Sequence, residues 1–163
     1  MKAEKIGKER QAAHPQGTKR YYSDPNVEDT IGVAGEIAFA ERYGLEIDDS
    51  IRPEGDGHID FKVKINNVEV TIDIKTAQKA YNLLIKEWEI NDCADILVLA
   101  KYTSDKKIDF LGWETKDVMK MMPKKIFSSL KIVNFYRSKN KLRPMTDLDD
   151  LFPNTKKDLF DFE

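Results

Sequence analysis

The chain has 163 residues, of which 34% are charged and 40% are hydrophobic, and its formal net charge is −2. These values are typical of one soluble globular domain with a sizeable core. The single cysteine, Cys93, excludes an internal disulfide and a zinc site built from several cysteines. No apolar run is long enough to span a membrane, and the charged start does not resemble a signal peptide, so we expect a cytoplasmic protein.

The first twenty residues are basic, with six Lys or Arg against two Glu. Such a composition predicts either a flexible tail or an arm that contacts DNA, and we assign this arm residues 1–22. A single domain over 23–152 and an acidic C-terminal tail over 153–163 complete the expected organisation.

A helix is predicted from about Val27 to Tyr43, where Gly44 stops it. Its many small residues would let it approach a sheet closely. Glu36 stands among them, because its neighbours at three and four residues are all small or apolar: Gly32, Val33, Phe39 and Ala40. A carboxylate in such a stripe predicts a functional acid, and the alternative is a residue solvated at the margin of the sheet.

Residues 58–76 alternate apolar and polar side chains on both sides of Asn66-Asn67. This pattern predicts a β-hairpin with a two-residue turn, since Asn tolerates positive φ. If Asn66 and Asn67 form the turn, opposed residues have numbers that sum to 133. One face is then apolar and predicted to be buried, and it includes Ile59, Phe61, Ile72 and Ile74.

The other face of the predicted hairpin ends in a charged cluster of His58, Asp60, Asp73 and Lys75. In this register Asp60 opposes Asp73, and directly opposed side chains lie about 5 Å apart at Cβ. Two like charges at that distance destabilise a sheet unless a cation binds between them. The pair therefore predicts a metal site, and the alternative is a solvent-facing row on an ordinary hairpin.

This arrangement resembles the PD-(D/E)XK nuclease superfamily, whose signature is an acid on one strand and an acid-x-Lys triplet on the next. Asp60 matches the first acid, Asp73-Ile74-Lys75 matches the triplet, and Glu36 matches the helical Glu that often accompanies them. Ile59 departs from the signature, where the family name has Pro. The resemblance covers roughly residues 30–115.

The resemblance implies a restriction-endonuclease-like αβββαβ core of the α/β (α+β) class, with a central mixed sheet flanked by helices. It also implies Mg²⁺ as cofactor, with Mn²⁺ able to substitute, held by Asp60, Asp73, the backbone carbonyl of Ile74, and Glu36. Lys75 would position or deprotonate the attacking water. His58, on the same face, is an auxiliary candidate.

Further elements follow the hairpin in chain order. Residues 81–90 predict a third strand, and the continuous apolar run of residues 94–100 predicts a strand buried on both faces. Residues 108–113 predict another strand. Thr115 can cap a short helix that extends to about Met122, and Thr146 can begin a second short capped helix that reaches Leu151.

Between Val118 and Thr146 the chain has eight basic residues and no acid. Phe127, Phe135 and Tyr136 are interleaved with them. This stretch predicts either a phosphate-binding surface with some base stacking or a solvated face beside core aromatics. The basic residues are Lys120, Lys124, Lys125, Lys131, Arg137, Lys139, Lys141 and Arg143.

Taken together, these patterns predict a Mg²⁺-dependent DNA endonuclease, of a structure-specific or repair and recombination type, rather than an exonuclease. The alternative is a catalytically silent nucleic-acid-binding or scaffold protein that retains the fold. DNA is the expected partner. A homodimer would be needed to resolve a four-way junction, although no stretch of the sequence marks an interface.

Overall fold

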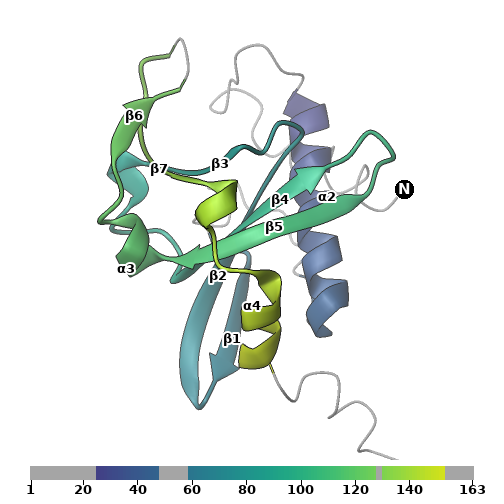
Figure 1. The fold of residues 1–163 in the computed structure, drawn as a ribbon. Helices are drawn as coiled ribbons and strands as arrows, with labels where there is room; N and C mark the ends of the chain where they lie inside the picture. Colours follow the sequence, from purple (N-terminus) through teal and green to yellow (C-terminus); the bar gives the residue numbers. More distant parts are fainter. Residues whose placement is uncertain (1–24, 48–58, 128–129, 153–163) are drawn as a thin grey trace, which may run out of the picture.

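The computed structural model of the protein describes residues 25–47, 59–127 and 130–152 (Figure 1). The basic arm 1–22, the tail 153–163 and His58 lie outside these residues. The described part is an α+β fold with two sheets and three α-helices. The central sheet has the strand order β1-β2-β4-β5, and the second sheet has the order β3-β7-β6.

The first described helix, α2 (Pro25–Tyr43), confirms the predicted helix. It ends where Gly44 takes a positive φ of 66°, a conformation that glycine adopts without steric cost. It packs against β2, and its small residues permit a close approach (Figure 1). A Cβ built at Gly35 would overlap the Thr76 hydroxyl, so the helix crosses β2 at this point.

The hairpin of β1 (Phe61–Ile65) and β2 (Val68–Ala77) has the predicted register, with Phe61 opposite Ile72 and Ile65 opposite Val68. Asn66 and Asn67 have φ values of 52° and 64°. Positive φ at both central residues is the requirement of a type I′ turn, which matches the twist of the strands. The turn and the hairpin register are therefore confirmed.

On its other side, β2 pairs in parallel with β4 (Ile96–Tyr102), and β4 pairs antiparallel with β5 (Ile108–Thr115). Residues 96–100 of β4 are all buried, as their continuous apolar run predicts. The strand predicted over residues 108–113 is also present, and β5 extends it by two residues.

A strand is present within the predicted residues 81–90, but it is shorter than predicted and belongs to the second sheet instead of the central one. The strand β3 (Asn82–Lys86) is followed by the 3-10 helix η1 (Glu87–Glu89). It pairs with β7 (Val133–Ser138), which also pairs with β6 (Lys124–Ile126), and so belongs to the second sheet. Leu83 and Ile85 are buried on a face of the central sheet and not at its edge. No α-helix lies between β2 and β4 in this described part of the chain.

Two short helices complete the described part. In α3 (Lys116–Met119), the side chain of Thr115 accepts a hydrogen bond from the backbone N–H of Val118, as predicted, although the helix ends before Met122. In α4 (Met145–Leu151), the predicted Thr146 cap is wrong, since the helix begins at Met145 and Pro144 takes the N-cap position without a side-chain bond. Proline supplies the required backbone angle but no capping oxygen.

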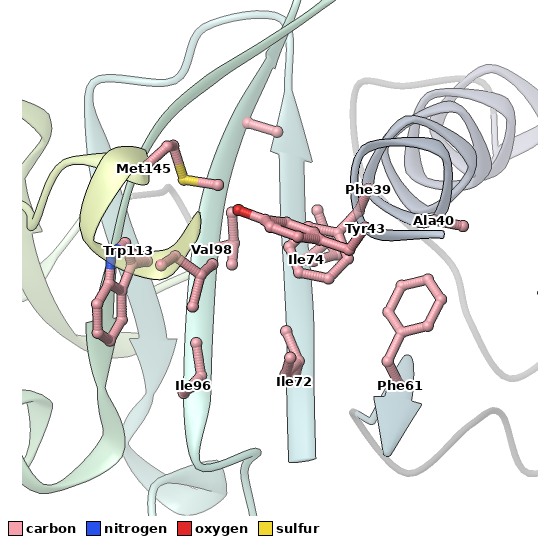
Figure 2. Close-up of a cluster of buried hydrophobic side chains, with 12 residues drawn as sticks. Phe39, Ala40, Tyr43, Phe61, Ile72, Ile74, Ile96, Val98, Trp113 and Met145 are labelled. Carbon is pink, nitrogen blue, oxygen red and sulfur yellow. The ribbon is translucent and has the colours of Figure 1, made fainter. Parts of the chain in front are cut away.

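The central sheet separates two hydrophobic clusters. The first, between the sheet and helices α2 and α4, has Ile72 at its centre, with no exposed surface (Figure 2). Its other buried members are Phe39, Ala40, Tyr43, Phe61, Ile74, Ile96, Val98, Ala100, Trp113, Met145 and Leu148. The second lies between the central sheet and the second sheet and contains Leu83, Ile85, Leu97, Leu99, Met119 and Phe135, among others.

The prediction that Ile59 is buried on the same face as Phe61 is wrong. Ile59 is half-buried, and it packs against the second cluster and not beside Phe61 in the first. The paired register of the hairpin ends at Phe61, and Asp60 donates its backbone N–H to Ile72 O at 2.9 Å. The chain thus leaves the regular alternation at Asp60. No helix of the described ranges has the length and apolar character to cross a membrane.

Candidate active site

The second half of β2 forms an open strand edge. Because β1 ends at Phe61, β2 from Asp73 onward has a ladder partner only in β4 among the described residues. The Asp60 carboxylate lies at this edge, where its Oδ2 accepts a hydrogen bond of 2.7 Å from the backbone N–H of Ile74. N–H and C=O of one strand residue point to the same side, so the Ile74 carbonyl points to this edge as well.

Asp73 and Lys75 project from the opposite face to Ile72 and Ile74, as side chains two apart on a strand must. The Asp73 side chain is 8% exposed, and its Oδ2 lies 2.9 Å from Lys75 Nζ. This short contact is an ion pair, so Lys75 is already a charged partner of that oxygen. A buried carboxylate oxygen in this condition has capacity left for a further cation or donor.

The charges around Lys75 are mostly negative. Burial by itself lowers the pKa of Lys75, but the carboxylates of Asp73, Glu89 and Asp60 outweigh burial and raise the pKa above its ordinary value of 10.5. Lys75 is therefore a protonated ammonium at neutral pH in this arrangement. Asp60 and Asp73 belong to the hairpin, and Glu89 belongs to η1, where its carboxylate also forms an ion pair of 3.8 Å with Lys86.

Glu36 is buried on α2, one residue after Gly35 and its contact with Thr76. It shares a helix face with Phe39 and Ala40 of the first cluster. The helix thus brings Glu36 to the part of β2 that directly follows Lys75, on the α2 side of the sheet. The Thr76 hydroxyl at this crossing is buried and has no hydrogen-bond partner within the described ranges.

The oxygen atoms of Asp60, Asp73 and the Ile74 carbonyl are the kind of ligand that a hard cation prefers, although they are too few to enclose it. Mg²⁺ is commonly held by one or two carboxylates together with water and substrate phosphate oxygens. Asp60, Asp73 and the Ile74 carbonyl offer such oxygens at one strand edge. Within the described residues, no group of three His, Cys, Asp or Glu side chains is placed to enclose a metal ion. The auxiliary candidate His58 lies outside those residues.

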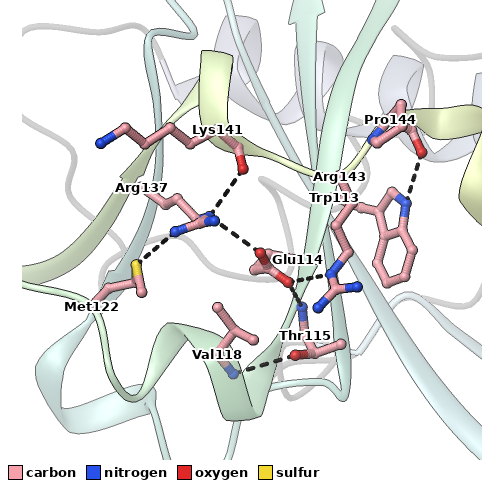
Figure 3. A network of polar contacts seen from close by, with 9 residues as sticks. All are labelled: Trp113, Glu114, Thr115, Val118, Met122, Arg137, Lys141, Arg143 and Pro144. Atoms are coloured by element: carbon pink, nitrogen blue, oxygen red, sulfur yellow. Dashed lines mark hydrogen bonds and ion pairs between the residues drawn. The ribbon is translucent and has the colours of Figure 1, made fainter.

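Two residues of the basic tract, Arg137 and Arg143, form ion pairs with the buried acid Glu114 (Figure 3). Glu114 on β5 is buried, with a side chain 2% exposed, and lies 3.1 Å from Arg137 Nε and 2.7 Å from Arg143 Nε. It also accepts a hydrogen bond from its neighbour's backbone, Thr115 N, at 2.9 Å. A buried carboxylate needs such compensation. Arg137 and Arg143 therefore join the second sheet and the chain before α4 to β5.

The lysines of the tract differ in their surroundings. Lys124 forms an ion pair with Glu87 at 2.8 Å, and both side chains are 49% exposed. The ammonium groups of Lys125 and Lys139 lie over the rings of Phe127 and Tyr81. The other three are exposed: Lys120, Lys131 and Lys141. Positive charge available to a polyanion is thus carried by lysines more than by the two arginines.

Sequence reasoning missed two buried acids, Glu89 and Glu114. Glu89 follows Trp88 at the end of the predicted third strand, where its charge looked like that of an ordinary surface residue. Glu114 stands between Trp113 and Thr115 on an apolar strand, which is a weak sign of burial. Their partners are distant in sequence, and no local pattern names them.

Comparisons of the chain with protein-family models, curated proteins and solved structures found no match.

Proposed function

We propose that the protein is a Mg²⁺-dependent DNA nuclease of the restriction-endonuclease-like class, acting as an endonuclease on structured or damaged DNA. The observation that carries this proposal is the buried Asp73 carboxylate, paired with Lys75 at an open strand edge that Asp60 also occupies. A purely structural pair at this place would leave the convergence of acids unexplained.

In this proposal Asp60 and Asp73 hold the metal ion with the carbonyl of Ile74, whereas Glu36, on the α2 side of the sheet, is not counted among its ligands. When bound, the ion supplies a Lewis acid that neutralises charge on the phosphodiester. The buried position of Asp73 keeps its carboxylate in one orientation. Asp60 is held in turn by its hydrogen bond to the backbone of β2.

In the same proposal, Lys75 is the cationic side chain that lies beside the scissile phosphate. Its ammonium can donate hydrogen bonds to a phosphate oxygen and orient the attacking water. Because the three surrounding acids raise its pKa, Lys75 begins as a proton donor, and it can accept a proton only after their charge is offset.

A second reading is a nucleic-acid-binding protein without catalysis. The Asp73–Lys75 ion pair favours it, since the lysine already neutralises the acid that would hold the metal ion. In that case Asp73 and Lys75 are only a buried pair between two sheets.

The experiment is a cleavage panel of linear, nicked, single-stranded, flap and four-way-junction DNA with Mg²⁺ or Mn²⁺. Asp60→Asn, Asp73→Asn and Lys75→Ala should each lower the rate about 10²–10⁴-fold, the range for a positioned acid, base or electrostatic group. Lys64→Ala is the matched control, because Lys64 is exposed on the same hairpin opposite Glu69.

Metal-dependent cleavage that the Lys75→Ala protein retains would remove Lys75 from the mechanism. Cleavage in excess chelator would remove the metal ion. Binding of DNA without cleavage of any substrate would establish the second reading.

A further inference from the structure

Exposed aromatic rings surround the second sheet, and each has a lysine over it. Tyr81, at the start of β3, and Trp88, in η1 after it, are both 63% exposed, and Phe127 after β6 is 39% exposed. An ammonium group lies 5.6 Å from the ring centroid of Trp88 and 5.7 Å from the other two. The lysines are Lys86 for Trp88, Lys139 for Tyr81 and Lys125 for Phe127.

Each exposed ring leaves apolar area in water that a ligand can cover. A flat ring beside a cation has a specific use, since nucleic-acid bases stack on aromatic faces while lysine neutralises the adjoining phosphate. Paired bases in a duplex are already stacked on their neighbours. Only unpaired nucleotides can therefore use such rings.

Trp88 lies in η1 between two acids, Glu87 and Glu89. Glu89 is buried, and its carboxylate forms an ion pair of 3.8 Å with Lys86, the lysine that lies over Trp88. The nearby negative charge of Glu87 is offset by its ion pair with Lys124.

We propose that this aromatic–lysine surface, made of Tyr81, Trp88 and Phe127 with their three lysines, binds unpaired nucleotides, and that Trp88 is one of the residues on which a base stacks. The inference takes DNA as the polymer from the proposed nuclease function. It adds the substrate class, which is single-stranded DNA or the unpaired arm of a flap or gap.

Two tryptophans make the test direct. Trp113 is 4% exposed and its indole N–H donates to Pro144 O at 3.0 Å, whereas Trp88 is in solvent. Quenching of tryptophan fluorescence by an oligonucleotide therefore reports on Trp88. The full chain is titrated, in excess chelator so that nothing is cleaved, with an oligothymidylate of about 15 nucleotides, near the upper end of known single-strand site sizes. A duplex of equal length is titrated in parallel.

We expect the oligothymidylate to quench the fluorescence of the wild-type protein more than the duplex does. Trp88→Ala should weaken binding of the oligothymidylate, followed by anisotropy of a labelled strand, by about 5- to 150-fold, the range for one stacked base. Trp88→Phe should restore much of that affinity while lacking the quenching. Val68→Ala is the control, because Val68 is 61% exposed at the hairpin turn.

Equal affinity of wild-type and Trp88→Ala protein for single strands would overturn the inference, as would equal quenching by duplex and single strand, or no binding of DNA at all. The two proposals fail separately. Trp88-dependent binding without cleavage under any condition contradicts the nuclease and supports the stacking surface. Cleavage that is lost in Asp73→Asn but unaffected, in rate and affinity, by Trp88→Ala does the opposite.

Discussion

Replacing Glu114 with alanine should lower the free energy of unfolding by about 3 kcal/mol. The carboxylate forms an ion pair with Arg137 and accepts hydrogen bonds from Arg143 Nε and the backbone N–H of Thr115. A hydrogen bond to a charged group contributes about 1.5–3 kcal/mol when its partner stays buried. Here the two arginine side chains are 24% and 46% exposed, and water can replace part of each contact. We therefore assign about 1 kcal/mol to each of the three contacts, below that range.

Urea denaturation followed by circular dichroism measures this loss. With a slope of about 1–3 kcal/mol per molar urea, the midpoint should fall by about 1–3 M. Glu69→Ala is the control, because Glu69 is an exposed acid on β2 and its loss should change stability by less than about 0.5 kcal/mol. A loss below about 1 kcal/mol for Glu114→Ala would refute the assigned role of the carboxylate. Arg137 and Arg143 would then be available to bind phosphate.

Two further predictions concern helix α2. Gly35→Ala should destabilise the protein by about 1–3 kcal/mol, because the new methyl group meets the Thr76 hydroxyl. Gly32→Ala should stabilise it by up to about 1 kcal/mol, because the space around Gly32 is open. The urea midpoints of the two variants measure both changes. Burial, followed by the hydrogen bond to Asp149, raises the pKa of Tyr43 above its ordinary value of 10.0. Its contribution to stability is complete below that value and is lost as the pH rises above it, so Tyr43→Phe should lose less stability than wild type between about pH 8 and pH 10.5. An equal loss in both proteins would contradict this assignment.

Elements set by local pattern could be predicted from the sequence. The hairpin follows from alternation and from Asn66-Asn67, whose positive φ values fix the turn and with it the register. Helix α2 follows from its small-residue stripe and the glycine that ends it, and β4 from its continuous apolar run. In each case the determining residues lie within the element.

Features that depend on distant partners could not be predicted. β3 pairs with β7, about fifty residues further along the chain, and nothing near β3 shows that it leaves the central sheet. The backbone bond of Asp60 ends the alternation that had placed Ile59 beside Phe61. In the candidate site, the sequence pattern placed Asp73 and Lys75 on one face, but the burial of Glu89 depends on how η1 packs against the rest of the fold.

The most direct test of the central claim is a calorimetric titration of Mn²⁺ into wild-type and Asp73→Asn protein, because it requires no knowledge of the substrate. Asparagine keeps the size of the side chain and removes its charge, so the fold should persist and the cation should lose its buried ligand. We predict saturable binding to the wild-type protein and binding weakened at least about tenfold in Asp73→Asn. Mutation of a residue that only hydrogen-bonds to a metal ligand already costs about 10- to 100-fold in metal affinity, so loss of a ligand should cost at least as much. Equal Mn²⁺ affinity in the two proteins, or no binding to either, would contradict the account.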